Sequence, residues 1–142
     1  MAEGLERFVA AQEPVWKQVV SELAEGRKRS HWMWFVFPQI AGLGMSATSV
    51  HYALASRAEA ADYLDHHVLG ARLRETTELM LGHAGVPADT ILGGIDAVKF
   101  RSSMTLFHAV APAEDRFANA LGVFFAGAED PRTRAILDAQ ER

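Results

Sequence analysis

The side chains that could bind or transform a ligand lie in three short stretches of the chain. The first is Gly42-Leu-Gly44-Met-Ser46, in which the glycines allow backbone N–H groups to point at an anion and the serine can cap a following helix. Lys28, at the centre of the basic run 27–29, would supply countercharge. The spacing is neither a P-loop nor a complete GxGxxG fingerprint, so a simple turn followed by a helix cap is the alternative interpretation.

The second stretch contains Trp32 and Trp34, flanked by His31 and Gln39. Indole rings can stack on a nucleobase or flavin-like ring, and a glutamine can hydrogen-bond to its edge. The alternative is that the tryptophans only fill the core. Because Trp34 lies within an unbroken apolar run, we expect Trp34→Ala to destabilise the fold by roughly 3–5 kcal/mol.

The third stretch contains Lys99, Ser102 and Ser103. On a helix, Asp96, Lys99 and Ser103 share one face, and a lysine beside hydroxyl groups suits an oxyanion or a phosphate. We therefore expect Lys99 and Ser103 to face a cleft together with part of segment 30–46. Alternatively, Asp96 caps the helix and pairs with Lys99, and the hydroxyl groups bond to the preceding turn.

Other kinds of catalytic or metal site have little support in the sequence. There is no cysteine, which excludes thiolate metal sites and cysteine nucleophiles. The GxSxG pattern of many serine hydrolases is missing, and Arg72 and Glu75 have the spacing of a structural ion pair. We expect no metal site and no cofactor, because no metal-binding spacing relates the six histidines, His31, His51, His66, His67, His83 and His108.

The composition indicates an ordinary globular protein. The chain has 142 residues, of which 49% are apolar and 23% charged, and its formal net charge is -4. An acidic chain lacks the cationic field that nucleic acids require. We expect a cytoplasmic protein without membrane contact, because the N-terminus has no signal-peptide core and no apolar run approaches the ~20 residues that span a bilayer.

Helical spacing of apolar residues, interrupted by glycine and proline, predicts an all-α fold in which short helices form a single compact domain over residues 1–142. Segment 30–37 is expected to be a short buried helix capped by Ser30, with a buried strand as the alternative. Asp96 is the expected cap of a late helix. The remaining helices are expected at 3–12, 14–25, 46–55, 56–65, 69–82, shortly after 87, 96–109, 112–126 and from 131 onward.

Ser30-His-Trp-Met-Trp-Phe-Val-Phe-Pro-Gln39, followed by Gly42-Leu-Gly-Met-Ser46, resembles the signature of an uncharacterised, mainly bacterial family, domain-of-unknown-function family eighteen-ten, sometimes labelled "calpastatin". The likeness covers nearly the whole chain and includes Val68-Leu-Gly70 and Ser102-Ser-Met-Thr-Leu-Phe107. His67 and Phe100 depart from the usual pattern, which has proline at the first position and often an aliphatic residue at the second. The resemblance implies a mainly helical fold and no particular activity.

Two functional hypotheses follow. The first is a domain that binds or processes a small anionic, nucleotide-like ligand. A specific version is an N-glycosidase acting on ADP-ribose-like substrates, because the layout around Lys99-Phe100 is faintly similar to that of helical glycosidases associated with NAD and ADP-ribose. Glu22, Glu59 and Glu75 would then be the candidate carboxylates. The second hypothesis is a non-catalytic protein-interaction or structural domain. The sequence does not indicate the oligomeric state.

Overall fold

The computed structural model describes residues 2–141, with the side chains of residues 4–141. The regular secondary structure of these residues is helical, which confirms the all-α prediction. In chain order the elements are α1 (Ala2–Gln12), the 3-10 helix η1 (Glu13–Val15), α2 (Trp16–Glu25), α3 (Met33–Val36), α4 (Ala47–His51), α5 (Arg57–Asp65), α6 (Leu69–Leu81), α7 (Ala88–Leu92), α8 (Gly94–Val110), α9 (Asp115–Phe125) and α10 (Pro131–Gln140).

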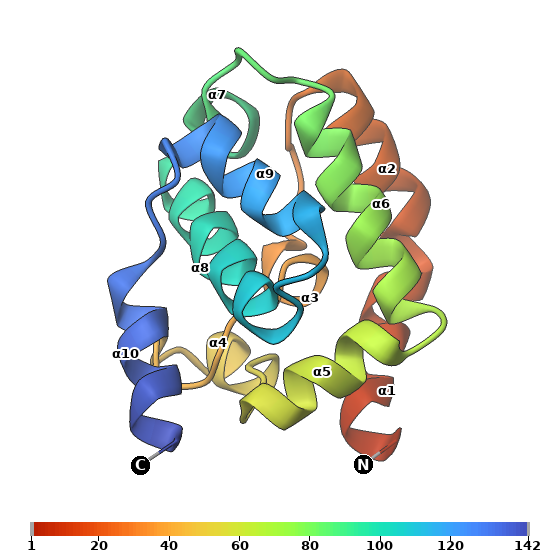
Figure 1. Cartoon of the computed structure of the whole chain (residues 1–142). Helices are drawn as coiled ribbons and strands as arrows, with labels where there is room; N and C mark the ends of the chain where they lie inside the picture. The colour runs from red at the N-terminus through yellow and green to blue at the C-terminus, as the bar shows by residue number, and fades with distance from the viewer. Residues whose placement is uncertain (1, 142) are drawn as a thin grey trace.

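Helix α8 lies in the middle of the molecule (Figure 1). It packs against α5, α7, α9 and α10. Its buried side chains include Phe100 and Phe107, and Phe37 of the α3 region meets Phe100 edge to face with a ring-centroid distance of 4.8 Å. Such aromatic pairs add to the apolar burial of a core. Phe100 and Phe107 flank Ser102 and Ser103, the candidate phosphate-binding residues, along α8, so the core fixes the position of this part of the helix.

Several helix ends lie where the sequence predicts them. Gly26 ends α2 in the left-handed conformation at φ 76°, which favours glycine. Ser46, Ser56 and Asp130 occupy the N-cap positions of α4, α5 and α10, and each side chain accepts a hydrogen bond from a backbone N–H of the first turn. Local signals of this kind are sufficient to set these boundaries.

Two predicted caps are wrong. Asp96 does not cap α8, because Gly93, at φ 88°, turns the chain and α8 begins at Gly94. Asp96 therefore lies within the first turn of α8. Ser30 does not cap segment 30–37, where α3 spans only Met33–Val36, because the Ser30 hydroxyl donates to the carboxylate of Glu22.

Two predicted helices are too long. Helix α4 ends at His51 rather than near residue 55, because Leu54 donates its N–H to Gln39 and accepts from Ala41. These two bonds form an isolated bridge between Ile40 and Leu54, which closes the ends of the 41–53 loop. Helix α9 begins at Asp115 rather than at residue 112, because residues 111–114 form a turn.

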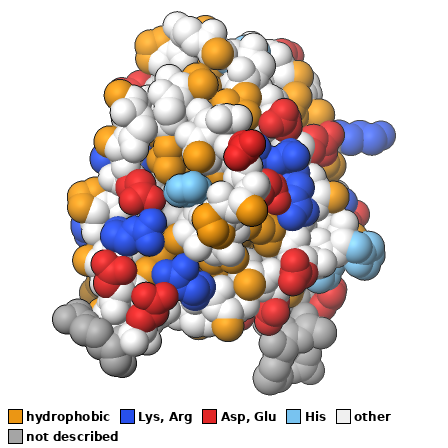
Figure 2. Space-filling model, in the orientation of Figure 1, with side chains coloured by type: hydrophobic (Ala, Val, Ile, Leu, Met, Phe, Trp, Pro, Cys, Tyr) orange, Lys and Arg blue, Asp and Glu red, His pale blue; other side chains and the backbone are white. Residues whose placement is uncertain are grey.

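The surface drawn in Figure 2 carries basic and acidic side chains in alternation, with apolar side chains between them. No patch of a single sign dominates this face. Within the described residues, no helix has both the length and the apolar content needed to cross a membrane.

Candidate functional site

Two adjoining clefts border the 41–53 loop, and we call them together the groove. The first lies between the loop and Trp34, and the second lies between the loop, α8 and the start of α10. Their cavities have volumes of about 220 and 330 Å³. They share the lining residues Gln39, Leu43, Gly44 and Ser49, so they lie next to each other. The first is also lined by Trp34, Ile40, Ala41, Gly42, Val50, Tyr52 and Ala53, and the second by Ile95, Val98, Lys99, Ser102, Asp130 and Arg132.

The first cleft is the aromatic end of the groove. Trp34 and Tyr52 are half-buried and contribute their side chains to its lining. Tyr52 is supported from behind by Phe8 and Phe35, with ring-centroid distances of 5.8 and 5.3 Å. The ring is therefore held in place by the core while part of it stays accessible. A planar ring of a ligand could pack against such walls.

The second cleft is the cationic end of the groove. The Nζ of Lys99 lies 5.0 Å from the centroid of the Trp34 ring, which is within the range of a cation–π interaction. The guanidinium of Arg132, in the first turn of α10, donates to the carbonyl of Leu43 at 3.3 Å and so connects α10 to the loop. Both cations keep N–H groups that can donate hydrogen bonds to an anion.

A third cleft, with a volume of about 330 Å³, lies on the other side of Trp34. Its lining includes Lys28, His31, Ile95 and Asp96. Lys28 Nζ contacts Asp96 Oδ2 at 2.8 Å, and Lys99 Nζ contacts Asp96 Oδ1 at 3.4 Å. One carboxylate thus bridges two lysines, which leaves a net positive charge beside Trp34.

Asp130 lies at the boundary between α8 and α10. Its carboxylate accepts hydrogen bonds from Ser102 Oγ, from Thr133 Oγ1 and from backbone N–H groups of α10. Burial alone would raise the pKa of Asp130, but these hydrogen bonds outweigh it and the pKa is lowered. The carboxylate is therefore ionised and fully engaged in holding α10 against α8.

Glu22 fixes the segment that precedes Trp34. Its buried carboxylate accepts from Arg29 N, Ser30 N, Ser30 Oγ and Trp32 Nε1, at 2.6 to 3.0 Å. Burial would raise the pKa of Glu22, but the hydrogen bonds outweigh it and lower the pKa from 4.5 to about 2. Glu22 is thus a buried structural anion that holds this segment through four hydrogen bonds and lines none of the three clefts.

The structure separates the predicted site residues. Gln39, Gly42, Gly44, Lys99, Ser102 and Trp34 line the groove, while Lys28 and His31 line the neighbouring third cleft. Trp32 is only 1% exposed and its Nε1 is bonded to Glu22, so its ring is not available to a ligand. Ser46 is an exposed cap that lines none of the three clefts.

Ser103 also differs from the prediction. Its side chain is fully buried and lines none of the three clefts, and its Oγ has no hydrogen-bond partner among the described residues. The next residues on α8 are also buried, because packing surrounds this part of the helix. Ser103 and Lys99 therefore do not act on the same cleft.

A core position was predicted for Trp34, but its side chain is half-buried. Trp32 is the tryptophan that lies in the core. The large loss of stability expected for Trp34→Ala therefore applies to Trp32. Residues two apart on a helix point about 200° apart, so a short helix through this segment must present one indole to the core and the other away from it.

The glycines of the loop serve its conformation. Gly42 has φ 108°, and a Cβ there would lie 3.2 Å from Ile136. A Cβ on Gly44 would lie 2.6 Å from the Cβ of Ser49, a distance that no side chain tolerates. The positive φ at Gly42 and the close approach of α4 to Gly44 both favour glycine, so the loop geometry explains the two glycines without a bound anion.

The sequence did not single out Ser49, Tyr52, Asp130 or Arg132 as groove residues. Asp130 and Pro131 correctly predicted the start of α10, which places Arg132 in its first turn. The packing of α10 against the loop is a contact between distant parts of the chain, and no local pattern reports it. His, Asp and Glu side chains in the described part of the chain form no group of three that could hold a metal ion.

The geometry defines an all-helical domain with a groove that has an aromatic end and a cationic end. The chain belongs to the family described as "Protein of unknown function (DUF1810)", whose model matches residues 2–137. A crystal structure of the conserved hypothetical protein Rv1873 from Mycobacterium tuberculosis is similar to it, with 48% sequence identity, a TM-score of 0.93, and coverage of 94% of this chain and 96% of that chain. None of the curated proteins matches the sequence.

Proposed function

We propose that the groove binds a small anionic ligand that carries a planar ring, such as a nucleotide. The observation that carries the proposal is the position of Lys99, whose Nζ lies over the Trp34 ring at the junction of an aromatic and a cationic cleft. A ring packed on Trp34 and Tyr52 would bring its anionic substituent toward Lys99 and Arg132. Aromatic and cationic groups are thus combined in one hollow.

The dimensions of the groove support this proposal. Small-molecule sites are clefts of roughly 300–1,000 Å³ with mainly apolar walls and a few polar groups that fix orientation. The two clefts, at about 220 and 330 Å³, together fall within this range. Gln39 and Ser49, which belong to both clefts, supply uncharged hydrogen-bonding groups at the centre.

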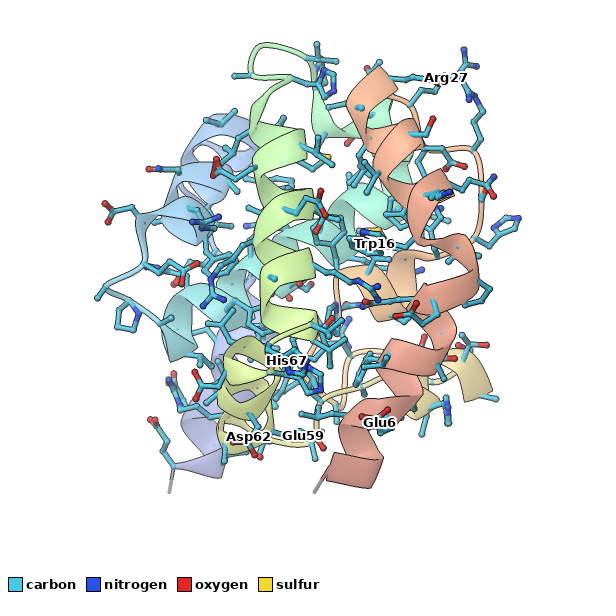
Figure 3. The ribbon with its side chains drawn as sticks, turned by 90° about the vertical axis from the view of Figure 1, so that its right-hand side faces the viewer. Glu6, Trp16, Arg27, Glu59, Asp62 and His67 are labelled. Carbon is cyan, nitrogen blue, oxygen red and sulfur yellow. The ribbon has the colours of Figure 1, made fainter. Side chains whose placement is uncertain are left out.

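Cleavage of an N-glycosidic bond has weaker support. Glu22 is buried and accepts four hydrogen bonds from its own neighbourhood. Glu75 is exposed on α6, and Glu59 binds the backbone of Ala55 from α5, at the base of the molecule in Figure 3. None of the three lines the groove. The carboxylate that does line it, Asp130, is held by its own hydrogen bonds. We therefore propose binding rather than hydrolysis.

Ligand titration tests the proposal. AMP, ADP-ribose and NAD⁺ are added to the protein while the melting temperature and the tryptophan fluorescence are recorded, with adenosine and inorganic phosphate as partial ligands. A ligand that binds only the native state raises the melting temperature. We expect at least one of the three nucleotides to bind more tightly than either partial ligand, because it occupies both ends of the groove.

Lys99→Ala should weaken that binding by roughly tenfold or more, the loss of about 1.4 kcal/mol, while the fold is retained. Lys17→Ala, which removes an exposed lysine from α2, is the matched control and should bind as the wild type does. If none of the nucleotides binds, or if the two variants lose affinity equally, the proposal is wrong.

A further inference from the structure

The groove is bordered by apolar side chains that water surrounds. Six large apolar residues are exposed among the residues described. Three of them line the groove, and a fourth, Met45, follows the lining residue Gly44 in the chain. Their exposed fractions are 93% for Met45, 63% for Val50, 76% for Ile95 and 62% for Val98. We call these four residues the rim. Val86 and Val123, the other two, are less exposed and line none of the groove.

The rim residues stand on both sides of the groove. Met45 and Val50 belong to the 41–53 loop, whereas Ile95 and Val98 belong to the first two turns of α8. Val50 lines the aromatic cleft, and Ile95 and Val98 line the cationic cleft. A ligand held inside the groove would leave the outward surfaces of these side chains in water. Clustered exposed apolar side chains mark a surface that another molecule covers.

The charge of the rim region limits what that molecule can be. The three cations beside the groove, Lys28, Lys99 and Arg132, outnumber the two carboxylates, Asp96 and Asp130. The local net charge is therefore +1, whereas the chain as a whole has a formal charge of -4. A membrane or a nucleic acid presents an extended anionic surface, which an acidic protein repels. A partner with a few local anionic groups and apolar neighbours meets the positive region without that repulsion.

We propose that the anionic group which enters the groove is presented by a partner protein, on a short segment rich in acidic and apolar side chains. The anion lies at Lys99 and Arg132, and the apolar side chains of the segment cover the rim. This inference rests on the anion-binding part of the proposed function, because it names what carries the anion, and it does not require the planar ring. It also explains why exposed apolar residues border a groove that contains Lys99 and Arg132.

Peptide selection tests the inference. A displayed library of random peptides is panned on the wild-type protein and counter-selected on the rim variant Ile95→Gln with Val98→Gln. Both side chains are exposed on α8, and glutamine is a good helix former, so the variant should fold. The selected peptides are then titrated against the wild type, the rim variant, Lys99→Ala and the control Val123→Gln, which removes an exposed valine from α9.

We expect the selected peptides to combine acidic and apolar residues and to lose roughly tenfold or more in affinity on the rim variant and on Lys99→Ala, with no change on Val123→Gln. Peptides without acidic residues, equal binding to all four proteins, or no enrichment over the rim variant would overturn the inference. Binding to phosphatidylserine–phosphatidylcholine vesicles that depends on the rim would overturn it in favour of a membrane.

The nucleotide titration separates this inference from the proposed function. If a nucleotide binds and the library gives no enriched peptide, the inference of a partner protein is overturned and the proposed function stands. Binding of acidic, apolar peptides without nucleotide binding supports the partner surface and overturns the free nucleotide as ligand. If neither probe binds, both proposals are overturned.

Discussion

Trp32 and Trp34 are two residues apart in the chain but lie in different surroundings. Trp32 is 1% exposed and donates its indole N–H to Glu22, whereas Trp34 is half-buried between two clefts. The sequence predicts an aromatic cluster here and cannot assign each ring its role, because α3 has only four residues and shows no periodicity. The difference follows from how the segment packs against the rest of the fold.

The two tryptophans should respond differently to truncation. We expect Trp32→Ala to lower the free energy of unfolding by about 3–5 kcal/mol, since it empties a large site in the core. Trp34→Ala should cost about 1–2 kcal/mol, because only part of its ring is removed from water. Urea denaturation measures both values. An equal loss for the two variants would contradict the packing described for Trp34.

The Glu22 carboxylate should make stability depend on pH. Its pKa is about 2 in the folded protein and 4.5 in the unfolded chain, so its contribution is present above pH 4.5 and is lost as pH falls toward 2. The difference corresponds to about 3 kcal/mol. We expect the free energy of unfolding of the wild type to fall more steeply over this range than that of Glu22→Gln. Parallel curves would show that Glu22 is not the source.

At the scale of the helices, local signals were sufficient where one residue sets a boundary. Gly26, Ser56 and Asp130 end or begin helices as predicted, because each acts on its own backbone neighbours. Asp96 was misassigned because the turn at Gly93 moves the start of α8, and its role depends on Lys28, far away in the chain. The groove was predicted only in part for the same reason: its walls come from three distant segments.

Two helical glycines should respond in opposite ways to alanine. A Cβ at Gly70, in the first turn of α6, would lie 2.0 Å from the carbonyl oxygen of Leu64, whereas a Cβ at Gly122 in α9 meets nothing within 4 Å. Gly70→Ala should therefore destabilise the protein by about 1–3 kcal/mol or more through overpacking. Gly122→Ala should stabilise it by about 1 kcal/mol, the difference in helix propensity. Thermal and urea unfolding of the pair check both signs.

At the scale of the whole molecule, the first and last helices contribute to the same hydrophobic core. The cluster of buried apolar residues extends from Leu5 in α1 to Leu137 in α10 and includes every long helix. The two ends of the chain lie at the same end of the molecule (Figure 1). Figure 3 shows Trp16 on α2 beside α6. The other two tryptophans belong to the α3 region, whereas α9 contains phenylalanines and no tryptophan.

We therefore expect a single cooperative unfolding transition. Far-UV circular dichroism, which follows all the helices, and tryptophan fluorescence, which follows α2 and the α3 region, should give coincident curves with denaturant. A second transition seen by one probe alone would show that part of the chain, such as α10, unfolds independently of the rest.

The bridge between Ile40 and Leu54 gives the groove a property that a wall of continuous helix would not have. Because Ala41 and Leu54 are joined by a backbone hydrogen bond of 2.8 Å, the 41–53 loop leaves the core and returns to it at nearly the same point. Compact loops of this kind tolerate insertions at their exposed tips. The side chain of Met45, 93% exposed at this tip, is thus the place in the loop where a substitution would alter the border of the groove while the helical framework stays unchanged.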